Sequence, residues 1–198
     1  MYAILRALIL LNEATGRGRS AEPQLTRVLV AYATRFGSTH EVASAIAHEL
    51  NSVGLEAHPA EVNSALDPND YDAFVIGSPL YGGKWMSTAG MFAAIKSEHM
   101  AGKPVALFSM GTMGVKRPEA ATAEHKAFVD NLTDVAPKLN VVVDAVFNGY
   151  FARANLPFFL KLIDRIMPTP EGDHRDWPAI QAWAKSLAPI FANEQAST

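Results

Sequence analysis

The segment from Val28 to Leu50 places the strongest constraint on the fold of this chain. Val28–Thr34 is a short, continuous and mostly apolar run, which is typical of a strand buried on both faces. Apolar residues at helical spacing follow from His40 to Val53, and Gly54 ends this pattern. A buried strand that passes through a short loop directly into a helix indicates a β-α-β unit, and therefore an α/β fold.

The rest of the chain repeats this alternation between strand and helix patterns. Strands separated by helices imply right-handed crossovers and a parallel sheet that is covered on both faces. We therefore predict an α/β, three-layer, doubly wound sandwich with a five-stranded parallel sheet. The later strands are expected at 56–62, 72–79, 104–112 and 140–147, and the later helices at 87–99, 122–135 and 176–191.

Residues 26–198 are expected to form one domain, because they are enough to bury a full core. Residues 1–25 are interpreted as an N-terminal extension that is either flexible or a short helix, with a membrane-surface or docking helix as the alternative. Its apolar stretch, Ala3–Leu11, is too short to span a bilayer.

Charge and cysteine content exclude several classes of function. A formal net charge of −3 without a basic stripe argues against nucleic-acid binding. The chain has no cysteine, so any redox chemistry must come from a bound cofactor. Asp173, His174 and Asp176 are interpreted as a polar loop before a helix cap, and no metal site is expected.

The loop before the first helix has the features of a phosphate site. The N-terminus of a helix offers unpaired N–H groups and partial positive charge to an anion. Gly37 allows close approach of the backbone, and Thr34, Ser38 and Thr39 supply hydroxyl groups. The Gly-Lys-Ser/Thr ending of a Walker loop is missing. The alternative is a capping box in which Ser38 is the N-cap and Glu41 reaches back to it.

Two further loops follow strong strands. In Ser78–Ser87, Tyr81 and Trp85 flank a pair of glycines, an arrangement that favours stacking on a flat ring, with loop anchoring as the alternative. Ser109–Glu119 carries two glycines whose backbone groups could read the edge of a heterocycle. Loops that follow parallel strands meet at the carboxyl edge of the sheet. A phosphate site, stacking aromatics and an edge-reading loop together indicate a mononucleotide, and FMN fits best in a chain without cysteine.

The segments ATRFGST (33–39), GSPLYGG (77–83) and SMGTMG (109–114) resemble the three FMN loops of the flavodoxin superfamily. Flavodoxin itself is a standard example of a doubly wound fold that holds FMN at its switch point. Over most of Thr26–Leu187 the chain is most similar to flavodoxin-domain proteins of the menaquinone-dependent protoporphyrinogen oxidase type. The resemblance implies the strand order 2-1-3-4-5.

The resemblance also implies the residues that hold the cofactor. It identifies no catalytic acid or base in the protein. Because protoporphyrinogen carries propionates, cations are expected around the entry of such a substrate, and Lys84, Lys116, Arg117 and Arg153 are the candidates. The FMN-binding residues are expected to be Thr34, Arg35, Phe36, Gly37, Ser38 and Thr39 at the phosphate, and Pro79, Leu80, Tyr81, Gly82, Gly83, Trp85, Ser109, Met110, Gly111, Thr112, Met113 and Gly114 around the ring.

The function expected from the resemblance is an FMN-dependent oxidoreductase that passes electrons from a reduced substrate, such as protoporphyrinogen, to a quinone or a redox protein. The alternatives are a flavodoxin-like electron carrier and a flavin-free interaction module. Electron-carrying flavodoxins are strongly acidic, which this chain is not. The expected location is the cytoplasm, with at most peripheral contact at the inner face of the membrane. Gly149–Met167 is interpreted as core, substrate wall or membrane contact.

Overall fold

The computed structural model describes residues 25–155 and 170–193. Its central sheet contains five long parallel strands in the spatial order β2-β1-β3-β5-β6. With the short strand β4 set aside, this is the predicted order 2-1-3-4-5, and the predicted α/β sandwich is confirmed. The long strands are β1 (Arg27–Tyr32), β2 (Glu56–Glu61), β3 (Ala73–Tyr81), β5 (Pro104–Gly111) and β6 (Asn140–Asn148).

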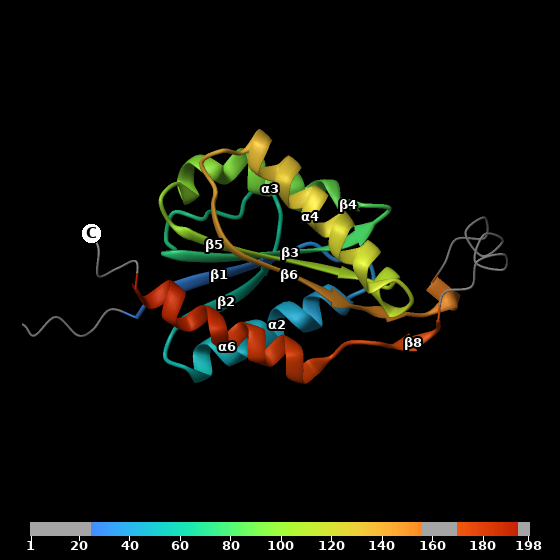
Figure 1. The fold of residues 1–198 in the computed structure, drawn as a ribbon. Coiled ribbons are helices and arrows are strands. Elements are labelled where there is room, and N and C mark those ends of the chain that lie inside the picture. The colour runs from blue at the N-terminus through green and yellow to red at the C-terminus, as the bar shows by residue number, and fades with distance from the viewer. Residues whose placement is uncertain (1–24, 156–169, 194–198) are drawn as a thin grey trace, which may run out of the picture.

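Helices cover both faces of the sheet (Figure 1). α2 (Ser38–Ser52) and α6 (Trp177–Asn193) lie on one face, and α3 (Ser87–Lys96) and α4 (Pro118–Val135) lie on the other. Alternate residues of β1 belong to different cores: Val28 packs with α2 and α6, and Leu29 packs with α3 and α4. A strand that feeds two cores must be apolar at successive positions, which explains the continuous run in the sequence.

Two helices on the second face differ from the predicted boundaries. α4 begins at Pro118 rather than near residue 122, because the fixed φ of proline suits the first turn and its missing N–H would have no partner there. α3 ends at Lys96, and a 3₁₀ turn, η1 (Ser97–Met100), follows it. The helix predicted over 87–99 is therefore two elements.

Three strands of two residues each were not predicted. β4 (Lys84–Trp85) pairs antiparallel with the end of β3 through a hairpin turn. Both turn residues, Gly82 and Gly83, have positive φ, 56° and 75°, as a two-residue hairpin requires. Farther along the chain, β7 (Tyr150–Phe151) and β8 (Gly172–Asp173) form a separate antiparallel ribbon.

The carboxyl ends of the long strands meet at one edge of the sheet. β4, the short 3₁₀ turn η2 (Met113–Val115) and the β7–β8 ribbon lie at this edge, and the beginning of β1 and the end of α6 lie at the opposite edge (Figure 1). The direction of the crossovers reverses between β1 and β3, so the switch point of the fold is here. None of the described helices is long and apolar enough to cross a membrane. The interpretations of residues 1–24 and 156–169 lie outside the described residues.

Candidate functional site

The loop between β1 and α2 has the geometry of an anion-binding turn. Gly37 is the N-cap of α2 with a φ of 87°, and its N–H donates a hydrogen bond of 3.0 Å to Thr34 Oγ1. No side chain caps the start of α2, so the alternative interpretation, a capping box with Ser38 as the N-cap, is wrong. Glu41 does not reach back to the loop, because its Oε2 accepts a hydrogen bond of 2.7 Å from Arg175 Nη1.

Thr39 supplies a buried polar atom that has no partner. Its side chain is 1% exposed, and within the described parts of the chain Thr39 Oγ1 meets no hydrogen-bond donor or acceptor. An unpaired buried hydroxyl is costly, and it lies in the first turn of α2, where backbone N–H groups also need acceptors. A phosphate bound at this helix end would satisfy both requirements.

A cavity of about 320 Å³, here called the cofactor cavity, adjoins this loop. Arg35 and Phe36 form part of its wall, and the Arg35 guanidinium lies 5.4 Å from the centre of the Phe36 ring. The cavity is therefore cationic at the phosphate end and aromatic at its rim. It is lined by Arg35, Phe36, Ser38, Pro79, Leu80, Tyr81, Met110, Gly111, Thr112, Gly149, Tyr150, Phe151 and Ala152.

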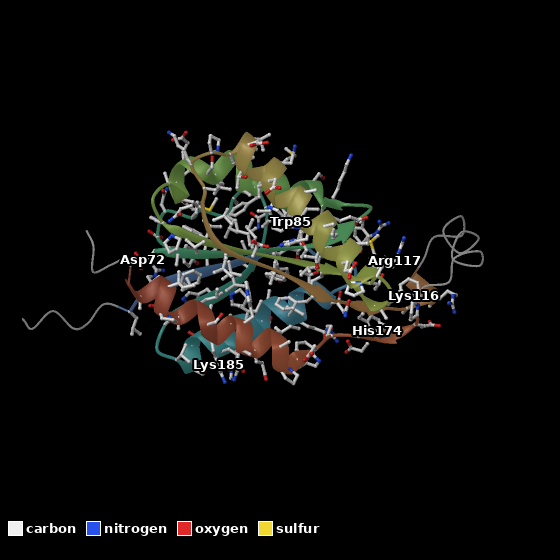
Figure 2. All side chains as sticks on the ribbon, viewed as in Figure 1. Asp72, Trp85, Lys116, Arg117, His174 and Lys185 are labelled. Carbon is white, nitrogen blue, oxygen red and sulfur yellow. The ribbon has the colours of Figure 1, made fainter. Side chains whose placement is uncertain are left out.

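A larger cavity of about 830 Å³, here called the outer cavity, shares Leu80, Tyr81, Gly111 and Thr112 with the cofactor cavity. Lys116 and Arg117 line it at the end of the sheet where the loops emerge (Figure 2). Its remaining lining residues are Gly82, Met113, Gly114, Pro118, Ala121, Thr122, Glu124, Val146, Phe147, Asn148 and Pro170.

Tyr81 stands between the two cavities at the tip of the β3–β4 hairpin. Its side chain is 49% exposed, so an aromatic face is available to a ligand. Burial of the hydroxyl raises the pKa of Tyr81, and the positive charge of Arg35 opposes this shift in part. The phenol is therefore neutral at physiological pH, and it lies within the electrostatic range of a cation of the phosphate loop.

Trp85 and Ser109 are not at this surface. Trp85 is 6% exposed and stacks on Phe128 of α4, with ring centroids 4.6 Å apart and planes inclined by 22°. Its indole N–H donates a hydrogen bond of 2.6 Å to Ser109 Oγ, and Ser109 is fully buried. Figure 2 shows Trp85 inside the layer between the sheet and the helices. Contrary to the prediction, neither Trp85 nor Ser109 lines the cofactor cavity or faces the space expected to hold a flavin ring.

The four predicted rim cations divide into two pairs. Lys116 and Arg117 line the outer cavity, whereas Lys84 and Arg153 line neither of the two cavities. Arg153 belongs to the 3₁₀ turn η3 (Arg153–Asn155), and its Nη1 lies 3.2 Å from Glu171 Oε2.

The residues directly after β6 were expected to be core, substrate wall or membrane contact, and not part of the cofactor site. Gly149, Tyr150 and Phe151 line the cofactor cavity, and the Gly149 N–H donates a hydrogen bond of 2.8 Å to Gly111 O. Their position directly after the fifth long strand was a usable signal, because this strand also ends at the carboxyl edge.

The geometry described above is that of a doubly wound protein with a phosphate loop at its switch point. A family model described as a flavodoxin domain matches residues 29–176, and the chain therefore belongs to the flavodoxin domain family.

A curated relative is the protoporphyrinogen IX dehydrogenase [quinone] of Escherichia coli strain K12. It is 26% identical to this chain over 173 residues, which cover 82% of this chain and 94% of the relative. Among solved structures, a short-chain flavodoxin associated with a non-canonical PDU bacterial microcompartment has a TM-score of 0.55 at 17% identity, and covers 84% of this chain and 99% of its own. Oxidised flavodoxin 2 from Bacillus cereus has a TM-score of 0.52 at 20% identity, with coverage of 85% and 99%. These structural similarities establish the fold.

The residues of the site fit FMN, the cofactor expected from the sequence. The unpaired hydroxyl of Thr39 suits a phosphate oxygen, and a Cβ built on Gly37 would meet no atom within 4 Å, so the turn leaves open space for a ligand. The half-exposed ring of Tyr81 suits the apolar face of a flavin. FMN is therefore the cofactor that this site is built to hold.

Proposed function

We propose that this chain is an FMN-dependent oxidoreductase that passes electrons from a small reduced substrate to a quinone or a redox protein. The observation that carries the proposal is the outer cavity, which adjoins the cofactor cavity and has a volume of about 830 Å³. This volume is in the range of small-molecule sites, which is roughly 300–1,000 Å³. A protein that only relays electrons through the exposed edge of its flavin has no need of such a space.

The division of labour between protein and cofactor follows from the residues present. FMN, when bound, accepts electrons from a donor and passes them to an acceptor. The phosphate loop 34–39 would anchor it through backbone N–H groups and the Thr39 hydroxyl. Tyr81 would cover part of the ring and separate it from bulk water. The protein contributes position and electrostatic surroundings, and no side chain of the site is assigned a proton-transfer role.

The chemistry of the outer cavity favours an anionic, partly apolar substrate. Lys116 and Arg117 bring positive charge to a cavity whose other walls include Val146 and Phe147. Glu124 also lines this cavity and limits its net positive charge. A flat molecule that carries carboxylates matches this arrangement. The similarity to the protoporphyrinogen IX dehydrogenase [quinone] makes protoporphyrinogen the first substrate to test, with a quinone as the acceptor.

The alternative function is that of a flavodoxin-like electron carrier. The aromatic side chains around the cofactor cavity favour it, because Phe36, Tyr81 and Tyr150 are 47%, 49% and 45% exposed and could contact a protein partner. A carrier would be reduced rapidly by a flavodoxin reductase and would turn over no small substrate.

The first experiment is an absorption spectrum of the purified protein, with acid release and identification of the chromophore. Released FMN would support both candidate functions, and a colourless protein that cannot be reconstituted with FMN would exclude both. Turnover of protoporphyrinogen with menaquinone or ubiquinone analogues then separates the two. Lys116→Ala and Arg117→Ala are expected to raise KM for a carboxylate substrate more than they change kcat. An unchanged KM would contradict the proposed role of the outer cavity.

A quinone acceptor implies contact with the membrane surface, and we propose a cytoplasmic protein that binds this surface peripherally. The test is cosedimentation of the FMN-loaded protein with vesicles that contain menaquinone, compared with quinone-free vesicles of the same lipids. Complete recovery of the protein in the supernatant with both kinds of vesicle would contradict this part of the proposal.

A further inference from the structure

A chain of three hydrogen bonds runs from the surface of β6 to the β3–β4 hairpin. His125 Nε2 of α4 lies 3.0 Å from Asp144 Oδ2 of β6, and His125 Nδ1 lies 2.7 Å from Ser109 Oγ of β5. Trp85 Nε1 of β4 donates a hydrogen bond of 2.6 Å to the same Ser109 Oγ. The chain therefore connects four different elements of the fold, and the cofactor site described above does not use its inner residues directly.

The direction of each hydrogen bond follows from the chemistry of the two ends. The indole N–H of Trp85 can only donate, and the ionised carboxylate of Asp144 can only accept. Burial lowers the pKa of His125, so the ring is neutral, and it must carry its proton on Nε2 in order to donate to Asp144. His125 Nδ1 is then an acceptor, and it receives the Ser109 hydroxyl proton.

A serine, a histidine and an aspartate in this order suggest hydrolysis, but the burial of Ser109 excludes that interpretation. Ser109 has 0% exposure, and Trp85 already donates to its oxygen. His125 is 2% exposed, whereas the Asp144 side chain is 49% exposed. No substrate can reach the serine. The series of hydrogen bonds therefore positions other groups, and Ser109 does not act as a nucleophile.

The buried end of this series of hydrogen bonds, at Trp85, holds the hairpin that carries Tyr81. Trp85 pairs with Leu80 across the hairpin, and Met86 N–H donates a hydrogen bond of 3.0 Å to Ser78 Oγ at its base. Ser109 directly precedes Met110, which lines the cofactor cavity. The bond between Trp85 and Ser109 therefore fixes the hairpin relative to the strand that forms another wall of that cavity.

We propose that Asp144 and His125 are positioning residues that act through Ser109 and Trp85 to hold the Tyr81 hairpin over the cofactor. Asp144 selects the Nε2–H form of His125, and this form leaves an acceptor for the Ser109 hydroxyl. If the proton moved to Nδ1, His125 and Trp85 would both donate to Ser109 Oγ, and the serine hydroxyl would lose its acceptor. The inference rests on the proposed FMN site.

The test compares Asp144→Ala, Asp144→Asn and the wild type by ¹⁵N NMR of the FMN-free protein. The Trp85 indole signal, one of three in the chain, is assigned with Trp85→Phe. In Asp144→Ala we expect the ring ¹⁵N shifts of His125 to leave the pure Nε2–H pattern. We also expect the indole signal of Trp85 and the amide signals of Gly82 and Gly83 to shift. Asp144→Asn keeps an acceptor oxygen and is expected to restore the wild-type pattern.

The FMN dissociation constant is the second measurement. We expect it to rise about tenfold in Asp144→Ala, as for the loss of one supporting hydrogen bond, and to recover in Asp144→Asn. Asp130→Ala is the matched control, because it breaks an exposed ion pair with Lys126 on α4 that does not touch the chain of hydrogen bonds. It should change neither measurement.

Three results would overturn the inference: a wild-type His125 that carries its proton on Nδ1, unmoved hairpin signals in Asp144→Ala, or unchanged FMN affinity in spite of shifted signals. A wild-type protein that binds no FMN would contradict the proposed function instead. In that case the amide signals of Gly82 and Gly83 in Asp144→Ala still decide whether the hydrogen bonds from Asp144 to Trp85 hold the hairpin.

Discussion

Arg175 Nη1 donates a hydrogen bond of 2.7 Å to Glu41 Oε2, and thereby joins the segment before α6 to the first turn of α2. The same guanidinium donates from Nε and Nη2 to Asp173, at 2.8 Å and 2.7 Å, and lies 4.5 Å from the centre of the Trp177 ring. The Arg175 side chain is only 8% exposed. A carboxylate beside the phosphate loop is therefore compensated by a nearly buried cation from the other end of the chain.

Replacement of Arg175 by alanine should weaken FMN binding by about fivefold to tenfold, because the charge of Glu41 then opposes the phosphate. The double variant Arg175→Ala/Glu41→Gln should recover most of this affinity, as measured by quenching of FMN fluorescence. Arg153→Ala, which breaks the ion pair with Glu171, is the control and should leave the affinity unchanged. A double variant that binds FMN as weakly as Arg175→Ala would contradict the electrostatic explanation.

Thr39→Val should separate the stability of the protein from its affinity for FMN. Valine has a similar shape and removes a buried hydroxyl that has no partner within the described residues. The FMN-free protein should therefore be as stable as the wild type, or more stable by about 1 kcal/mol in urea unfolding. FMN affinity should fall about tenfold, whereas the affinity for riboflavin, which lacks the phosphate, should not change. Equal losses for both ligands would show that the hydroxyl does not bind phosphate.

Gly37 and Gly54 form a matched pair for testing the phosphate loop. They have φ values of 87° and 91°, and a Cβ built on either would meet no atom within 4 Å. Gly37→Asp and Gly54→Asp should thus each lower the free energy of unfolding by about 1 kcal/mol. Only Gly37→Asp should abolish FMN binding, because it places an anion against the phosphate. Retention of FMN by Gly37→Asp in titrations would place the phosphate elsewhere.

His125 should make the stability of the FMN-free protein depend on pH. Burial lowers its pKa from the ordinary value of 6.5, although Asp144 opposes the shift. The unfolded chain then binds more protons than the native state as the pH falls below about 6.5, so stability is full above this value and is lost as the pH decreases toward the folded pKa. Urea unfolding between about pH 7.5 and 5.5 should show a smaller loss for His125→Gln than for the wild type. An equal loss of stability in His125→Gln and the wild type would show that the pH dependence comes from other groups.

The sequence was sufficient for the order of the elements along the chain and for the position of the turn between β1 and α2, because both depend on local patterns. The burial of β1 on two faces and the glycine just before α2 leave clear signatures over short stretches, although the N-cap itself is Gly37 and not Ser38. The role of Trp85 could not be predicted, because an aromatic residue after a glycine turn can face outward or inward. Its partners Ser109 and Phe128 come from distant segments and decide the outcome.

Contacts between remote elements also explain what the sequence analysis missed. β7 and β8 are two residues each and exist only because they pair with one another across a long separation in the chain. The hydrogen bonds of His125 to Ser109 and Asp144 join three elements with no characteristic spacing. Neither hydrophobic periodicity nor a short motif records such arrangements, so only the folded structure reveals them.

The β7–β8 ribbon has a consequence for how this protein can diverge. Phe151 pairs with Gly172, so two positions that are 21 residues apart in the sequence lie side by side. The length and composition of the sequence between these two positions can therefore change without altering the register of the five long strands. Because Tyr150 at the base of the ribbon lines the cofactor cavity, each such change occurs next to the site. Relatives could thus acquire new substrates or partners by exchanging this one segment, while the flavin-binding framework stays the same.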